Sequence, residues 1–274
     1  FNRIVTNCAA DVVMALTESR KRVKIEGEGI NPDKIRIIPN GVDLKKVKSE
    51  KSEVKDKYRR KLGADEDTVL VGTLSRLTVE KGIRYFIESL PRVADSGLRF
   101  AVLIGGSGEL RDELKARVRR LGLELKSVPR QFPNLEGSEN LQDFSLAGSD
   151  SQVCFLGFVP EEEKWDYLSA LDIFVFPSLA EGFGISLIEA MAAGCACLVS
   201  DLDVLKEVGG DAVQYFKTRN PEDLAEKLVG LIANEEKRNE LSSRVQKMVE
   251  KEYSLEKFLD RYQDLYESLL EKDE

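Results

Sequence analysis

The sequence predicts an α/β protein with a doubly wound, Rossmann-like parallel sheet, and three observations support this fold class. Between residues 69 and 250, short apolar segments alternate with longer segments that have apolar residues at helical spacing. The short segments are apolar throughout, as expected for strands that helices cover on both faces. The chain has 274 residues and is 42% hydrophobic, which suits a packed core.

Each predicted strand is a short run of β-branched, aromatic and other apolar residues, and each predicted helix has an apolar stripe beside charged residues. Glycine or proline ends several of these units. The predicted elements, in chain order, are strand 69–74, helix 81–94, strand 100–104, helix 109–121, strand 153–156, helix 161–170, strand 173–176, helix 185–193, strand 196–199, strand 212–215 and helices between 221 and 270.

The alternation lapses between about 125 and 151. This stretch contains Pro129, Pro133, Gly137 and several serines and asparagines, which favour loops. We therefore predict a long surface insertion there.

The segments outside residues 69–250 have a different character. Residues 1–43 contain a helical run from Ala10 and the turn Pro39-Asn40-Gly41, and we interpret them as the remnant of a preceding domain with its connecting segment. Residues 44–68 are densely charged and are predicted to form a solvated linker or helix. Residues 251–274 carry an apolar stripe at helical spacing and are predicted to form a C-terminal helix.

Composition excludes several classes of function. The chain has no histidine, which removes Ser-His-Asp triads, histidine general bases and the commonest metal ligand. A net charge of −8 argues against a nucleic-acid partner held through its phosphates. The sequence shows neither a signal peptide nor an apolar run of about eighteen residues, and its four cysteines suggest reduced thiols, so we expect a cytoplasmic protein.

The strongest chemical signal lies in residues 177–191, where a strand ends, a loop carries Glu181 and glycines open a helix. The amides of residues 182–184 are expected to point out of the helix start, where unpaired N–H groups and the helix dipole attract anions. Glu189, about one turn into the helix, can accept hydrogen bonds from a ribose diol. On chemistry alone, an ordinary glycine loop before an acidic helix explains these residues equally well.

The segment Glu-Gly-Phe-Gly-x-x-x-x-Glu-Ala-Met-Ala, which starts at Glu181, resembles the signature of retaining GT-B glycosyltransferases of family 4. The resemblance implies that residues 69–250 are the C-terminal, donor-binding half of a GT-B fold and bind a nucleotide-diphosphate sugar. It implies that Glu181 contacts the donor sugar and that Glu189 contacts the nucleotide ribose. The last helix would then be the family's crossover helix.

Three further segments resemble the family's pattern in the same order. Arg76 and Lys81, after the first strand, match the pair that clamps the donor diphosphate, although two solvated surface cations are the simpler interpretation of these residues alone. The glycine turn at residues 105–109 matches the turn after the second strand, and residues 156–160 match the segment whose backbone meets the nucleobase. The implied catalytic residues are Glu181, Arg76 and Lys81; the implied donor-binding residues are Glu189, Gly182, Phe183, Gly184, Ile185, Gly105, Gly106, Gly157, Phe158 and Val159.

Two other motifs are interpreted as structural. Asp201-Leu202-Asp203 resembles a metal-binding Asp-x-Asp, but two carboxylates alone make a poor metal site, so we predict that it caps the next helix and that the protein needs no metal. Cys195 and Cys197 lie in an apolar strand and are predicted to be buried thiols.

The resemblance implies transfer of a sugar from a UDP-, GDP- or ADP-sugar to an acceptor hydroxyl, with retention and without a cofactor. The family's N-terminal domain, which binds the acceptor, is absent apart from the remnant, and the chain starts at Phe1 rather than Met, so we expect a fragment or a subunit. A sugar, lipid or small-molecule acceptor would then be held by the missing half, by a partner chain or at a membrane surface that the missing half contacts. The alternative is a donor-binding subunit or nucleotide-binding protein that is inactive without a separate acceptor-binding domain.

Overall fold

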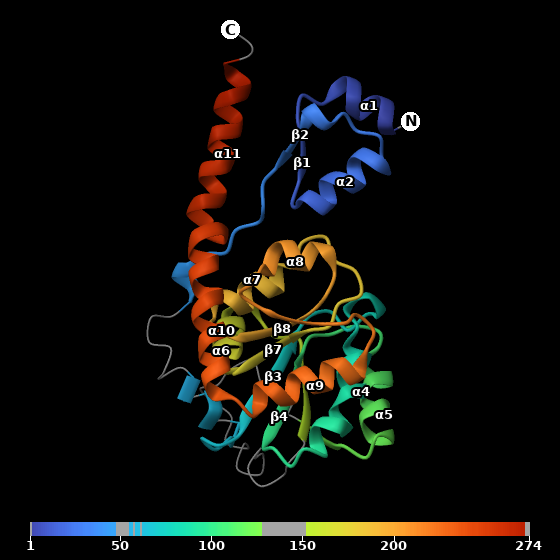
Figure 1. The fold of residues 1–274 in the computed structure, drawn as a ribbon, viewed down its shortest axis with the longest axis vertical. Helices are drawn as coiled ribbons and strands as arrows, with labels where there is room; N and C mark the ends of the chain where they lie inside the picture. The colour runs from blue at the N-terminus through green and yellow to red at the C-terminus, as the bar shows by residue number, and fades with distance from the viewer. Residues whose placement is uncertain (1, 48–54, 57, 61, 128–151, 272–274) are drawn as a thin grey trace.

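The structure is a computed structural model that describes residues 2–47, 55–56, 58–60, 62–127 and 152–271 (Figure 1). Its helices and strands are α1 (Asn2–Ala9), β1 (Val13–Ala15), α2 (Glu18–Glu26), β2 (Ile35–Ile37), β3 (Val69–Leu74), α4 (Ile83–Ala94), β4 (Phe100–Gly105), α5 (Arg111–Arg120), β5 (Glu124–Ser127), β6 (Gln152–Gly157), α6 (Glu161–Ala170), β7 (Ile173–Phe176), α7 (Ile185–Ala192), β8 (Ala196–Ser200), α8 (Asp203–Gly209), β9 (Gln214–Phe216), α9 (Pro221–Ile232), α10 (Glu235–Met248) and α11 (Leu255–Leu270).

The described residues form a seven-stranded parallel sheet in the order β5-β6-β4-β3-β7-β8-β9. Helices cover both faces of this sheet (Figure 1). The predicted doubly wound parallel α/β fold is therefore confirmed. In the N-terminal segment, β1 and β2 form a second, two-stranded parallel sheet.

Two apolar cores lie on opposite faces of the sheet, because successive side chains of a strand point to opposite sides. In β3, Leu70 packs into the core that contains α6 and α7. Val69 and Val71 pack into the other core, with α4, α5 and α9. The same alternation in β4, β7 and β8 explains why these strands carry apolar residues on both faces.

The strand order reverses between β3 and β7. The chain runs outward from β3 through β4 to one edge, and from β7 through β8 and β9 to the other. At such a reversal, doubly wound sheets bind their ligands in a crevice outside the carboxyl ends of the strands. Residues 75–82 and 177–184 are the loops at this point.

The N-terminal segment differs from the prediction. The expected helical run from Ala10 is wrong, because β1 occupies residues 13–15 and α2 begins only at Glu18, after Thr17 caps it. The strand forms because β2, more than twenty residues later, supplies a parallel partner. The amides of Glu18 and Ser19 donate to the Glu207 carboxylate of α8 at 2.6 and 2.7 Å, which docks this segment on the larger domain.

The charged segment after residue 44 is less solvated than predicted. Its described residues 55–56 and 58–60 are helical, and Tyr58, Arg59 and Leu62 are buried. The Arg59 guanidinium donates to Asp172 Oδ2 at 2.8 Å and to the Thr68 carbonyl oxygen at 2.6 Å.

Three smaller differences concern element boundaries. Strand β5 pairs with β6 and so extends the sheet into the first residues of the predicted insertion, whose remainder, 128–151, lies outside the described residues. Strand β9 starts at Gln214, two residues later than expected. The C-terminal region is helical but is interrupted by a π-helical turn at Val249–Tyr253.

Helix α11 extends beyond the sheet domain, alongside the N-terminal segment (Figure 1). Leu259, Tyr266 and Leu270 are exposed on it. The connecting segment lies against its start, where Val42 N–H donates to the Tyr253 carbonyl oxygen at 2.8 Å. Among the described residues, none of the helices combines the length and apolar character that a membrane span requires.

Asp172, between α6 and β7, is expected to be a main electrostatic contributor to stability. Its oxygens accept from Lys55 Nζ at 2.7 Å, Arg59 Nη1 at 2.8 Å and the Leu70 amide at 2.8 Å. Asp172→Asn should lower the free energy of unfolding at pH 7 by about 3 kcal/mol, because it leaves a buried guanidinium without its charge partner. Urea denaturation measures this change.

The pH dependence of this effect has a defined sign. Burial opposes ionisation of Asp172, but Lys55 and Arg59 outweigh it and hold the pKa of that carboxyl below its ordinary value. The stabilisation is therefore complete above about pH 4 and is lost as the pH falls through the folded-state pKa. The matched control is Asp67→Asn, whose side chain is 83% exposed and which should change stability by less than about 0.5 kcal/mol. Equal losses in the two variants would contradict the assignment.

Candidate functional site

The two loops at the switch point are fixed to each other by backbone contacts. The Leu179 amide donates to the Glu80 carbonyl oxygen at 2.7 Å. Gly82 has a φ of +63°, and a Cβ on it would lie 1.9 Å from the Pro177 carbonyl oxygen. Only glycine allows this approach without strain. The side chains that the two loops carry are therefore held in one constellation.

Lys81 and Glu181, predicted from separate motifs, meet in this crevice. Lys81 Nζ lies 2.6 Å from Glu181 Oε1, although the residues are 100 positions apart. Their side chains are only 17% and 8% exposed, so bulk water screens the pair weakly. Ser178 Oγ also donates to Glu181 Oε1, at 2.7 Å. Ser178 was not predicted as a site residue, although it lies in the motif that carries Glu181.

Arg76 lies on the same loop as Lys81 but does not join this pair. Its side chain is 73% exposed, and its guanidinium is 3.2 Å from Glu80 Oε1. An exposed ion pair of this kind contributes little to stability. The Arg76 side chain can therefore leave Glu80 and bind another anion with only a small loss of free energy.

The start of α7 has the free amides that an anion site requires. Gly184 is the N-cap with a φ of +100°, and no side chain caps this helix. Among the described residues, no acceptor lies in hydrogen-bonding position for the amides of residues 182–185. Nothing lies within 4 Å of where a Cβ on Gly182 would be, and Ile185 is exposed. Phe183 is buried edge-to-face against Tyr253 and anchors the loop by its side chain.

Glu189 lies in the second turn of α7 and faces α6. Its Oε1 is 2.6 Å from Lys164 Nζ, and the side chains of the pair are 14% and 13% exposed. Burial raises the pKa of the Glu189 carboxyl above its ordinary value, and Lys164 offsets part of that rise. Lys164 was not identified from the sequence, because nothing local indicates that it reaches a residue 25 positions away.

The predicted glycines after β4 and β6 have clear packing roles. Gly106 has a φ of +131°, and a Cβ on it would lie 1.8 Å from the Ser75 carbonyl oxygen. Its amide donates to the Gly157 carbonyl oxygen at 2.6 Å and is therefore not free for a ligand. Gly105 leaves room for Val159, which would lie 3.1 Å from its Cβ.

The segment after β6 is more open. Gly157 has a φ of +78°, and nothing lies within 4 Å of where its Cβ would be. Phe158 is the most exposed of the large apolar side chains described, at 75%. An exposed ring beside an open glycine is suited to cover a planar group. The family resemblance had implied a contact of the nucleobase with the backbone of this segment.

The interpretation of Asp201-Leu202-Asp203 as a helix cap is wrong. Leu202 is the N-cap of α8, and no side chain caps that helix. Asp201 instead accepts from the amide and hydroxyl of Thr218 at 2.8 and 2.7 Å, which ties β8 to the segment after β9. Cys195 and Cys197 are buried, as predicted. Among the described residues, no group of three Cys, Asp or Glu side chains is arranged to hold a metal ion.

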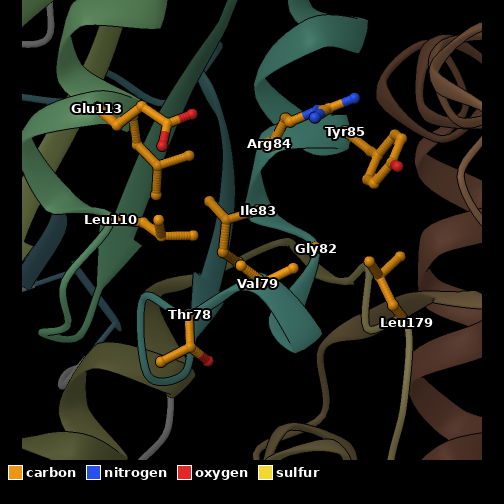
Figure 2. Close-up of a pocket in the computed structure, with 10 residues that line it drawn as sticks. Thr78, Val79, Gly82, Ile83, Arg84, Tyr85, Leu110, Glu113 and Leu179 are labelled. Carbon is orange, nitrogen blue, oxygen red and sulfur yellow. The ribbon is translucent and has the colours of Figure 1, made fainter.

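A separate pocket of about 170 Å³ lies beside the crevice, at the starts of α4 and α5. Figure 2 shows Val79, Ile83 and Leu110 around it, with Glu113 to one side. Neither the Lys81–Glu181 pair nor Glu189 lines this pocket. It adjoins the two loops through Gly82 and Leu179, so it borders the candidate site without being part of it.

Chemically, the crevice combines a lysine, free amides and a buried carboxylate. The cation and amides suit an anion such as a diphosphate. The carboxylates of Glu181 and Glu189 are suited to accept hydrogen bonds from hydroxyl groups of a ligand. This is the constellation expected for a nucleotide-diphosphate sugar.

Comparison with known proteins identifies the family. A family model described as "Glycosyl transferases group 1" matches residues 67–234, which include both loops and both glutamates. An uncharacterised glycosyltransferase of Methanocaldococcus jannaschii is 30% identical over 196 residues, which are 70% of this chain and 43% of that protein. N,N'-diacetylbacillosaminyl-diphospho-undecaprenol alpha-1,3-N-acetylgalactosaminyltransferase of Campylobacter jejuni is 31% identical over 222 residues, which are 78% of this chain and 49% of that protein. The chain thus spans less than half the length of these curated relatives.

Solved structures agree in fold. Anabaena HepE in complex with UDP-glucose matches with a TM-score of 0.77 and 20% identity, covering 97% of this chain and 66% of that chain. The C-terminal domain of a glycosyl transferase group 1 family protein of Francisella tularensis matches with a TM-score of 0.60 and 23% identity, covering 78% of this chain and 100% of that one. The fold is therefore that of the C-terminal half of a GT-B protein, and with a family model that matches more than half of its length, the chain belongs to the group 1 glycosyl transferases of family 4.

Proposed function

We propose that this chain supplies the donor-binding half of a retaining glycosyltransferase, which moves a sugar from a nucleotide-diphosphate sugar to an acceptor hydroxyl. The observation that carries the proposal is the contact between Lys81 and Glu181, which joins the two loops at the switch point of the sheet directly before the free amides of residues 182–185. These groups come from two loops that backbone contacts lock together. The donor site would therefore be preorganised before any ligand arrives.

The proposed role of Lys81 is to bind and stabilise the donor diphosphate. Its ammonium is held by Glu181, and the residues that follow Glu181, 182–185, have free amides. Arg76 would join by leaving Glu80, and its planar guanidinium suits phosphate oxygens. Negative charge grows on the diphosphate as its bond to the sugar breaks, so these groups would lower the barrier to transfer.

The two glutamates would hold the groups on either side of the diphosphate. Glu181 is fixed through one oxygen by Lys81 and Ser178, so its carboxylate would orient hydroxyls of the sugar. Glu189 would accept hydrogen bonds from the ribose, and the segment of Gly157, Phe158 and Val159 would cover the base. The solved HepE complex contains UDP-glucose, which makes UDP the first nucleotide to test.

The proposed route needs no histidine base. The bond between the anomeric carbon and the phosphate oxygen breaks, the acceptor oxygen bonds to that carbon from the same face, and the acceptor proton moves to the departing phosphate oxygen. Retention follows from attack on the same face. The residues described here would orient and stabilise the donor, while the phosphate itself acts as the base.

The acceptor would be bound outside the described donor site. The chain covers less than half of its curated relatives, and the exposed residues of α11 offer a surface for further protein. A donor-binding subunit that acts with a separate acceptor-binding chain is the second candidate. Adding the N-terminal half of a relative and measuring sugar transfer distinguishes a half-enzyme from a protein that only binds nucleotides.

Calorimetric titration with UDP, GDP and ADP tests the donor site directly. At least one of these should bind at millimolar concentration or below. Lys81→Met is expected to weaken UDP binding about tenfold to a hundredfold, because it removes a charged donor to the diphosphate. Binding of uridine, which has no phosphate, should change little.

Arg84→Met is the matched control, since Arg84 is an exposed cation at the start of α4 that pairs with Glu88 at 3.3 Å. It should leave UDP affinity within about twofold of the wild type. Absence of binding for all three nucleotides would refute the donor site. Equal effects of the two variants would refute the role of Lys81.

Glu189→Gln is expected to reduce UDP affinity about tenfold, because a neutral amide is a weaker acceptor for the ribose hydroxyls than a carboxylate. The wild type should prefer UDP over 2′-deoxy-UDP, and the variant should lose most of that preference. Competition titration with the two nucleotides measures it. Glu240→Gln, on the exposed side of α10, is the control that should preserve the preference. A preserved preference in Glu189→Gln would place the ribose elsewhere.

A further inference from the structure

Lys164 joins the first turn of α6 to the candidate ribose contact on α7. Its Nζ lies 2.6 Å from Glu189 Oε1 and 2.6 Å from Glu161 Oε2. The side chains of Lys164 and Glu189 are 13% and 14% exposed, whereas that of Glu161 is 57% exposed. The lysine is therefore a bridge from a solvent-exposed carboxylate to a largely buried one.

This contact differs from the surface ion pairs of the chain. Lys164 Nζ lies 5.2 Å from the centre of the Trp165 ring, and Trp165 is itself buried. Water screens a largely buried pair only weakly, and a buried charge that loses its partner is strongly destabilised. The lysine is thus fixed in place while it holds Glu189.

The charged groups near Glu189 alternate in sign: a lysine contacts Glu189, a glutamate contacts that lysine, and a second lysine contacts that glutamate. Among the described residues, Lys164 and Glu161 come from α6, and Lys46 comes from the short 3-10 turn Leu44–Lys46 after the connecting segment. Lys46 Nζ lies 3.5 Å from Glu161 Oε1. Lys164 is the member in direct contact with Glu189, so its charge dominates the local field at that carboxylate.

We propose that Lys164 is a positioning residue for the donor ribose, which keeps Glu189 charged and fixes its Oε1 so that Oε2 faces the ribose hydroxyls. This inference rests on the proposed function, because it assumes that Glu189 contacts the ribose. It adds a residue to the donor site that no motif of the chain indicates. Lys164 acts through Glu189 and does not itself contact the nucleotide.

The proposal has a specific consequence for pH dependence. Burial raises the pKa of the Glu189 carboxyl, Lys164 opposes that rise and Glu161 adds to it. Without the lysine, the pKa of Glu189 rises further, so the carboxyl becomes protonated at a higher pH. A protonated Glu189 is a weaker acceptor for the diol. As the pH falls, UDP binding should therefore weaken at a higher pH in a Lys164 variant than in the wild type.

The experiment measures UDP and 2′-deoxy-UDP affinity of the intact chain by calorimetry from pH 8 to pH 6. For Lys164→Met, we expect the deficit in UDP affinity relative to the wild type to grow to about tenfold at pH 6, together with loss of the preference for UDP. Comparison with the wild type at each pH cancels the ionisation of UDP itself. Lys164→Arg, which keeps the charge, should restore both properties.

Two further variants separate positioning from a general loss of structure. Glu189→Gln removes the titrating carboxyl, so its UDP affinity should not show the added pH dependence, and the double variant with Lys164→Met should match it. Lys227→Met removes a lysine that pairs with acidic residues on α9 and should leave UDP binding unchanged. Lys164→Gln, with circular dichroism as a check of folding, replaces Lys164→Met if the latter does not fold.

The outcomes are distinguishable from failure of the proposed function. If the wild type binds no nucleotide, the donor site and this inference both fail. If Glu189→Gln matters but Lys164→Met keeps the wild-type pH profile and preference, the inference alone is overturned. Tighter UDP binding by Lys164→Met also overturns it, because that result would mean that Lys164 competes with the ribose for Glu189.

Discussion

The close approach of Gly82 to Pro177 is the constraint on which the rest of the site depends. A Cβ at residue 82 would lie 1.9 Å from the Pro177 carbonyl oxygen, so the loops after β3 and β7 meet backbone to backbone. The hydrogen bond from Leu179 to Glu80 holds them in that position. Lys81 is next to this contact in one loop and Glu181 is in the other, so their ion pair follows from the backbone rather than from flexible side chains.

Charge in the crevice is balanced by pairs in which each cation keeps a carboxylate in place. Lys81 holds Glu181 and Lys164 holds Glu189, and all four side chains are mostly buried. Carboxylates held in this way can accept hydrogen bonds from hydroxyl groups without first changing their own positions. This is the physical basis of preorganised binding. In the proposed reaction, a chain without histidine would use these carboxylates to orient the sugar donor and would leave proton transfer to the reacting phosphate.

The sequence predicted those features whose cause is local or whose partners share a recurring pattern. Apart from β5, the strands and helices of the sheet domain were predicted, because apolar periodicity and flanking glycines record the environment of each segment. Strand β1 and the buried Tyr58 were missed because their partners lie far along the chain. Asp201 was misassigned for the same reason, because its carboxylate accepts from Thr218, 17 residues later, instead of capping the next helix. The motif identified Glu189, but Lys164, which holds it, required the packing of α6 on α7.

The proposed division of the activity between two halves rests on two features of this structure: the loops of the sheet and the exposed side chains of α11. Every group that the proposal assigns to the diphosphate and to the donor sugar comes from loops of one sheet, so the proposed donor binding would need no other domain. Beyond the sheet, α11 carries exposed Leu259, Tyr266 and Leu270, and the connecting segment is fixed to its start through Val42. An acceptor-binding partner placed there would be set relative to the donor by rigid backbone contacts. Sugar transfer would then depend on how the two halves meet, while nucleotide binding would depend on this chain alone.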